Sequence, residues 1–151
     1  MKHLNIDDLP RKHKVGAEGY EFTRRDFLGV HEARSLVRVY EIPPGKSAYL
    51  YHYHLKNEET FFILKGQGLL RSSEGERMVR PGDLLFFPAG EAGAHKLTNP
   101  SETETLVYLD FDIVHDLDVT VYPDSGKLGI WGKDTNKLYR IGDDVDYYDG
   151  E

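Results

Sequence analysis

The sequence predicts an all-β protein, built as an antiparallel sandwich or barrel of short strands. Segments rich in β-branched and aromatic residues recur along the chain, turns with Gly and Pro separate them, and helical periodicity is weak. At 151 residues the chain is long enough to bury one hydrophobic core, and no internal repeat argues for a second domain.

The strands are expected in a regular series after a polar start. The first 30 residues are expected to be irregular, apart from one short strand at 20–22. "RSLVRVYEI" at 34–42 is rich in strand-forming residues and is the first long strand. Further strands are expected at 47–54, 59–65, 68–72, 76–80, 84–87, 95–98 and 104–112. Turns such as "KGQG", "RPGD" and "PAGEAG" separate them, because Gly and Pro supply the backbone angles that turns need.

The composition divides the chain into three parts. Residues 1–33 form an N-terminal extension, 34–114 the strand-rich barrel, and 115–151 a C-terminal extension. This last part is first rich in Gly and then acidic with aromatic residues. We expect it to pack on the barrel or to be partly disordered.

Charge and cysteine content limit the classes of function. The formal net charge is −7, which argues against an electrostatic nucleic-acid binder. The chain has no cysteine, so disulfides and thiolate metal sites are excluded. No segment has the apolar length of a signal peptide or a membrane span. We expect a cytoplasmic protein with neither a nucleic-acid nor a membrane partner.

Two histidines in "YHYHLKNEE" are candidate metal ligands. Strand side chains alternate between faces, so His52 and His54 share a face about 7 Å apart and can reach one ion. A tight turn at 55–58 would return the chain as an antiparallel strand. Its alternate residues divide between two faces, Glu59, Phe61 and Ile63 on one and Glu58, Thr60, Phe62 and Leu64 on the other. Both faces are apolar further along, so alternation leaves open which glutamate joins the histidines, or whether both are exposed turn acids.

A third histidine lies downstream, in "GDLLFFPAGEAGAHKLTN". By itself His95 could be a structural residue of its strand. With the histidine pair and one carboxylate it completes a set of three nitrogens and one oxygen. Such a set suits one divalent transition metal, Fe, Mn, Ni, Zn or Cu, and affinity alone does not choose among them.

The spacing of these residues resembles the cupin superfamily. Its first motif, G-x5-H-x-H-x3-4-E-x6-G, is matched from Gly45 to Gly66, with one extra residue before the first histidine. The second motif, G-x5-P-x-G-x2-H-x3-N, is matched from Gly82 to Asn99, with two extra residues before the histidine. Both insertions fall in turns, where added length is tolerated. The 15 residues between the motifs are typical of small single-domain bacterial cupins.

The resemblance implies a double-stranded β-helix, or jelly roll, with a metal bound by His52, His54, Glu59 and His95. The six residues between the glutamate and the motif glycine favour Glu59 over Glu58. The resemblance also implies that the protein forms a homodimer. The three residues Tyr49, Tyr51 and Tyr53 would point out of the barrel, where an extension or a second subunit would cover them.

Three further residues are candidates for contact with the metal ligands or the substrate. Asp110 shares a strand face with Tyr108 and could orient a ligand histidine or act as a base, or it could be a solvated strand end. Arg38 could meet an anionic group of a substrate at the mouth of the barrel, or it could be a surface residue.

The leading hypothesis is a metal-dependent enzyme that acts on a small polar molecule, of the oxygenase or isomerase type. The alternative is a non-catalytic cupin that binds or senses a small molecule. An enzyme requires a titratable group beside the metal ligands, whereas a purely structural domain would have a filled interior with hydrogen-bonded histidines.

Overall fold

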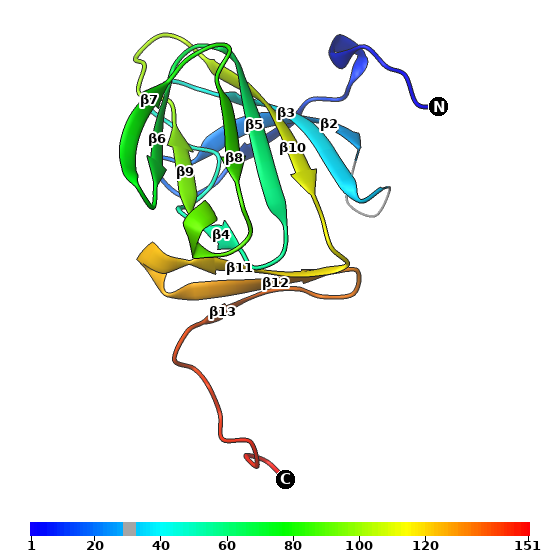
Figure 1. Cartoon of the computed structure of the whole chain (residues 1–151), viewed down its shortest axis with the longest axis vertical. Helices are drawn as coiled ribbons and strands as arrows, with labels where there is room; N and C mark the ends of the chain where they lie inside the picture. The colour runs from blue at the N-terminus through cyan, green and yellow to red at the C-terminus, as the bar shows by residue number, and fades with distance from the viewer. Residues whose placement is uncertain (29–32) are drawn as a thin grey trace.

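Figure 1 shows the computed structural model of the chain, whose described residues are 1–28 and 33–151. Their regular elements are strands and three short 3-10 helices, so the all-β prediction is confirmed. The strands are β1 (Lys12–Val15), β2 (Glu21–Leu28), β3 (Ser35–Ile42), β4 (Tyr53–His54), β5 (Glu58–Lys65), β6 (Gly68–Ser72), β7 (Gly75–Val79), β8 (Leu84–Phe87), β9 (His95–Thr98), β10 (Leu106–Ile113), β11 (Leu117–Tyr122), β12 (Lys127–Gly132) and β13 (Asn136–Arg140). The 3-10 helices are η1 (Ile6–Asp8), η2 (Glu91–Gly93) and η3 (Pro123–Ser125). No helix among the described residues has the length and apolar character to cross a membrane.

The strands form three sheets. A six-stranded sheet has the order β1-β2-β3-β10-β5-β8, a three-stranded sheet the order β7-β6-β9, and a four-stranded sheet the order β13-β12-β11-β4. From β3 to β11 each strand lies in a different sheet from the strand before it, except for the β6–β7 pair, as in a double-stranded β-helix. The sequence predicted a barrel. The hydrogen-bonded ladders of the described strands form separate sheets instead and do not close into one continuous barrel.

Two predictions of local structure were wrong. The N-terminal part is not irregular, because β1 and β2 pair with each other and extend the large sheet. The expected hairpin after His54 is absent as well. β4 pairs with β11 through His54 and Thr120, whereas β5 pairs with β8 and β10. Only two residues of the expected strand at 47–54 are in a named strand.

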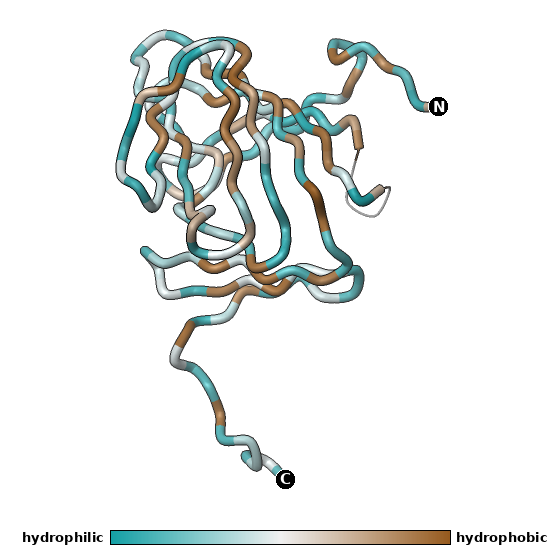
Figure 2. The backbone as a smooth tube through the Cα atoms, viewed as in Figure 1, coloured by the Kyte–Doolittle hydropathy of each residue, from teal (hydrophilic) through white to brown (hydrophobic). Residues whose placement is uncertain are grey.

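The core lies between the large sheet and the three-stranded sheet. One face of each of β3, β5 and β10 points inward, a choice that the sequence had left open, and the buried side chains on these faces include Tyr40, Ile42, Phe61, Ile63, Leu106 and Tyr108. Figure 2 shows brown apolar stretches along these strands. Toward the β11 end of the same inward faces, the apolar residues give way to Arg38, Glu59, Asp110 and Asp112.

The C-terminal sheet lies across one end of the other strands (Figure 1). Its attachment is the β11–β4 pairing, which brings Thr120 opposite His54. β12 and β13 continue this sheet outward, and residues 141–151 then extend away from the body of the protein. The polar end of the core therefore faces side chains from β11 and β12.

Candidate metal centre

His52 and His95 are held together by their backbones. They form an isolated antiparallel bridge, in which the His52 N–H donates to the His95 carbonyl at 3.1 Å and the reverse bond is 2.9 Å. Both side chains are buried, and their ring centroids are 4.7 Å apart. The two motifs of the sequence therefore meet at this bridge.

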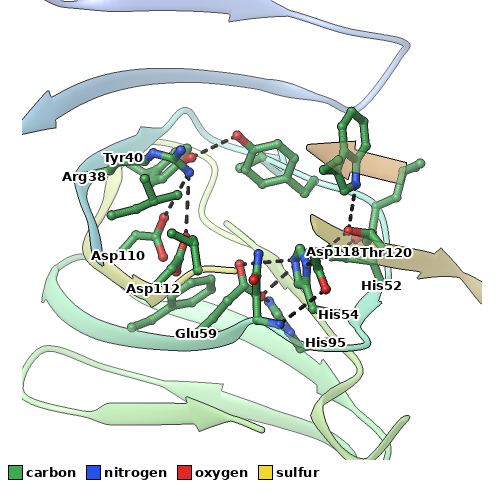
Figure 3. Close-up of a pocket in the computed structure, with 18 of the residues that line it drawn as sticks. Arg38, Tyr40, His52, His54, Glu59, His95, Asp110, Asp112, Asp118 and Thr120 are labelled. Atoms are coloured by element: carbon green, nitrogen blue, oxygen red, sulfur yellow. Dashed lines mark hydrogen bonds and ion pairs between the residues drawn. The ribbon is translucent and has the colours of Figure 1, made fainter. Parts of the chain in front are cut away.

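His54 and Glu59 reach the same place from β4 and β5. Glu59 shares the inward face of β5 with Phe61, the glutamate that the motif spacing favoured, and Figure 3 shows its carboxylate among the three imidazoles. The Glu59 oxygens lie 3.8 Å from His52 Nε2, 3.7 Å from His54 Nε2 and 3.3 Å from His95 Nε2. Ligand atoms bound at about 2.1 Å to one ion lie about 3 Å apart at right angles, close to these separations.

Hydrogen bonds fix which nitrogen of each imidazole is free. His52 Nδ1 lies 2.7 Å from the Leu50 carbonyl and His95 Nδ1 lies 2.9 Å from the Gly93 carbonyl. His54 Nδ1 lies 2.5 Å from an oxygen of Asp118. Carbonyl and carboxylate oxygens only accept, so each Nδ1 carries the proton. In its neutral form each ring therefore presents the lone pair of Nε2 toward Glu59, the orientation that metal-binding histidines need.

The donor set fits a metal ion on this structure's own evidence. His52, His54 and Glu59 each offer an atom within 4.8 Å of the others, and His95 joins them through Glu59. His95 Nε2 is buried and has no hydrogen-bond partner among the described residues. A buried nitrogen without a partner is costly, and a cation would satisfy it.

Burial sets most of the pKa values in this group. It lowers the pKa of His52 to about 4, with help from the nearby His54, and holds the pKa of His95 well below its usual range. Both imidazoles are therefore neutral at neutral pH, as metal binding requires. Burial raises the pKa of Glu59 to about 7. For His54 burial acts downward, but the hydrogen bond to Asp118 and the charge of Glu59 outweigh it and raise the pKa.

The C-terminal sheet supplies residues that the sequence analysis missed. Asp118 on β11 is 1% exposed and accepts from His54. Thr120 Oγ1 lies 3.1 Å from the same His54 nitrogen and accepts a 2.8 Å hydrogen bond from Trp131 Nε1. The signal was present in "LDVTVY", where Asp and Thr alternate with apolar residues in the manner of an inward polar face.

Arg38, Asp110 and Asp112 form a charged wall beside Glu59. Arg38 Nη1 lies 3.9 Å from an Asp110 oxygen and 3.8 Å from an Asp112 oxygen (Figure 3). Both aspartates are buried, so neither is a solvated strand end, and Arg38 is not a surface residue. Burial and the neighbouring Asp112 raise the pKa of Asp110 well above its usual range.

Asp110 does not orient any of the three candidate ligand histidines, because their Nδ1 atoms pair with the Leu50 carbonyl, Asp118 and the Gly93 carbonyl. Tyr108 is buried and stacks on Tyr40 at 5.1 Å between ring centroids. Asn99 is also buried, and it closes the turn before Pro100 by hydrogen bonds to Ile42, Glu104 and Ser101.

Of the three tyrosines that were expected to point out of the barrel, Tyr49 points inward instead. Tyr49 lines the same cavity as the histidines and its hydroxyl lies 2.9 Å from that of Tyr40. Alternation fails here because residues 48–51 are not in a strand. Tyr51 lies under the Arg71 guanidinium, which also pairs with Asp124 of the C-terminal part.

These side chains enclose a cavity of about 340 Å³. Its lining combines the three histidines and Glu59, the charged wall, and residues of β11 and β12. This volume is within the range of small-molecule sites. The interior is therefore not filled, in contrast to what a purely structural domain would show.

Comparison with known proteins identifies the family. The family model described as "Cupin domain" matches residues 38–112. A structure from Acidithiobacillus ferrooxidans, provisionally named a sugar phosphate isomerase, is 30% identical, covers 93% of this chain and 91% of that one, and has a TM-score of 0.81. The chain belongs to the cupin superfamily.

Two further relatives differ in what their names state. A cupin-superfamily sugar phosphate isomerase from Silicibacter pomeroyi has a TM-score of 0.81 at 21% identity, over 96% of this chain and 97% of that one. An oxalate-binding protein from Thermotoga maritima is 31% identical over 74 residues, which are 49% of this chain and 58% of that protein. The likeness to the Silicibacter pomeroyi structure shows a shared fold, and the two names state different functions for those proteins.

Proposed function

We propose that this cupin is a metal-dependent enzyme that acts on a small polar molecule and belongs to the isomerase type. The proposal depends on one observation, that three imidazole Nε2 atoms face one carboxylate inside a cavity. His52, His54, Glu59 and His95 would hold one divalent ion, of Fe, Mn, Ni, Zn or Cu. An ion there would act as a Lewis acid on a carbonyl or hydroxyl oxygen.

The chain's own groups support catalysis over simple binding. Asp110 and Asp112 each have a carboxylate oxygen within 4.8 Å of one of Glu59. Isomerisation of a hydroxy-carbonyl compound moves a proton between neighbouring carbons, so it needs such a group beside the bound substrate. Apolar walls that include Leu36 and Phe61 would limit the access of water.

The isomerase type is favoured over the oxygenase type by the 30% identity to the provisionally named sugar phosphate isomerase along nearly the whole chain. A second candidate is non-catalytic binding of a small anion. The oxalate-binding relative supports it, although the match covers half of this chain. In that case the metal would contribute positive charge, and no product would form.

The first experiment is elemental analysis of untagged protein, with His52→Ala, Glu59→Ala and the matched control Glu58→Ala. We expect about one metal per chain in the wild type and in Glu58→Ala, and none in the other two. The metal-bearing protein would then be incubated with sugar phosphates and followed by NMR for isomerised product. Absence of metal after reconstitution with each divalent ion would overturn the proposal, and oxalate binding without turnover would favour the second candidate.

We also propose that the chain forms a homodimer. Leu84 and Phe86 on β8 and Phe111 on β10 are 72%, 60% and 40% exposed. Their strands flank β5, whose Phe62 and Thr60 stand directly opposite them, so they share one outer face. Light scattering of the purified chain tests this proposal, and a monomer at micromolar concentration would contradict it.

A further inference from the structure

The charged wall has hydrogen-bonding atoms that the protein leaves unused. Asp110 Oδ1 and Asp112 Oδ1 are buried and reach no hydrogen-bond partner in the described part of the chain. The Arg38 Nε–H is also buried without a hydrogen-bond partner in that part of the chain, and it lies 3.6 Å from Asp26 Oδ1 on β2 in a looser ion pair. Asp110 and Asp112 are 3% and 5% exposed, and both line the cavity with Arg38. Such groups are costly unless something in the cavity pairs with them.

A second cation is a poor partner for this wall. Glu59, Asp110 and Asp112 have oxygens within 4.8 Å of one another, a grouping that could hold an ion in isolation. However, the Arg38 guanidinium already lies 3.8 and 3.9 Å from the two aspartates. Arginine does not lose its proton in proteins, so it would repel a metal ion placed between them.

We propose that Arg38, Asp110 and Asp112 bind adjacent hydroxyl groups of a polyhydroxylated substrate. This inference rests on the proposed function and names the substrate class of that same site. A hydroxyl both donates and accepts, so it can pair with an aspartate oxygen in either protonation state and with a guanidinium, which only donates. Two neighbouring hydroxyls can therefore pair with the aspartates and with arginine at once.

The same wall discriminates against a dicarboxylate such as oxalate. Three acidic side chains, Glu59, Asp110 and Asp112, already gather beside the single Arg38, so a second anionic end would add negative charge that no further cation on the wall offsets. Because both aspartates lie beside Glu59, a molecule that contacts the metal ligands reaches the wall within a few atoms. The wall therefore selects for hydroxyls close to the reacting carbon.

Titration calorimetry on the metal-loaded protein tests the inference. The probes are D-ribose 5-phosphate and D-glucose 6-phosphate, each beside its 2-deoxy analogue, with sodium oxalate for comparison. We expect at least one sugar phosphate to bind about fivefold or more tightly than its deoxy analogue, because charge-assisted hydrogen bonds are about twice as strong as neutral ones. We also expect it to bind more tightly than oxalate.

Asp110→Asn and Asp112→Asn should bring that ratio close to one without changing the metal content. Asp134→Asn, which changes an exposed carboxylate in the β12–β13 turn, should leave the ratio unchanged. The inference is overturned if no sugar phosphate binds, if the wild-type ratio is one, or if folded Asn variants keep the wild-type ratio. The wild-type ratio stands as a test even where a variant folds poorly.

The readouts separate this inference from the proposed function. Hydroxyl discrimination without isomerised product would overturn the proposed function and leave the binding wall in place. If isomerised product forms and both Asn variants keep the wild-type ratio of sugar-phosphate to deoxy-analogue affinity, the hydroxyl-binding role of the wall is overturned and the proposed function stands.

Discussion

His54 Nδ1 and Asp118 Oδ2 lie 2.5 Å apart, although 64 residues separate them in the sequence. The other oxygen of Asp118 accepts from the backbone N–H groups of Lys56 and Asn57, at 2.9 and 3.3 Å. One buried carboxylate on β11 therefore orients a candidate metal ligand and holds the turn between β4 and β5. The C-terminal sheet is in this way part of the candidate metal centre.

Asp118→Asn should weaken metal binding by about 10- to 100-fold, the usual effect of losing a carboxylate behind a metal-binding histidine. The side-chain amide of this variant no longer favours the tautomer of His54 in which Nδ1 carries the proton. The tautomer with a free lone pair on Nε2, which binds metal, is therefore less populated. Calorimetric titration with Mn²⁺ or Zn²⁺ measures the change. Asp124→Asn, in the helix η3 that follows β11, is the control. Unchanged affinity together with a lower melting temperature would mean that Asp118 serves only the fold.

Metal removal should lower the stability of the wild-type protein. Ligand binding to the native state stabilises it by about 2.7 kcal/mol when the free metal is at 100 times its dissociation constant. We expect the melting temperature to rise when Mn²⁺ or Zn²⁺ is added to chelator-treated protein. Glu59→Gln should abolish this rise and Glu58→Gln should keep it. An equal rise in both variants would place the binding site elsewhere.

The grouping of the four candidate ligands could be predicted because it depends on the spacing within two sequence motifs. His52, His54 and Glu59 lie within eight residues, and His95 follows the second motif. Asp118 and Thr120 were missed since their partners come from the β4–β11 pairing, which joins distant segments. Alternation grouped Asp110 with Tyr108 on one strand face, but it does not show whether that face or the Arg38 face points inward, nor how far the polar end of the core extends.

For a related reason, the sequence predicted only a short strand at 20–22, where β2 runs from Glu21 to Leu28. "EFTRRDFL" carries three consecutive charged residues, which do not favour a strand when the sequence is read alone. In the fold Asp26 pairs with Lys12 on β1, and Arg25 pairs with Glu41 on β3. Cross-strand ion pairs therefore satisfy these charges, and only the tertiary structure reveals their partners.

Asp26 should contribute stability that depends on pH. Burial acts to raise its pKa, but the hydrogen bond from Lys12 and the charges of Arg24 and Arg38 outweigh burial and lower the pKa below 3.8. A lowered carboxyl pKa stabilises the native state above the unfolded value, and this contribution is lost as pH falls through the folded value.

Asp26→Asn should therefore cost about 1 kcal/mol of unfolding free energy at pH 7, and the difference should disappear in strong acid. Urea unfolding at several pH values measures it. Asp7→Asn is the matched control, since the Asp7 side chain is 85% exposed in its pair with Arg25. A constant difference from pH 7 to pH 2 would contradict the assignment.

Gly66 and Gly82 belong to the two cupin motifs, and the structure predicts different costs for replacing them. Both have positive φ, 75° and 96°, which a side chain disfavours by about 1–2 kcal/mol. A Cβ on Gly66 would also lie 2.7 Å from the backbone oxygen of Thr105, whereas a Cβ on Gly82 would meet nothing within 4 Å. Gly66→Ala should therefore destabilise the protein by at least about 1 kcal/mol more than Gly82→Ala in urea unfolding. Equal losses would show that backbone conformation alone, and not the contact with Thr105, requires glycine at residue 66.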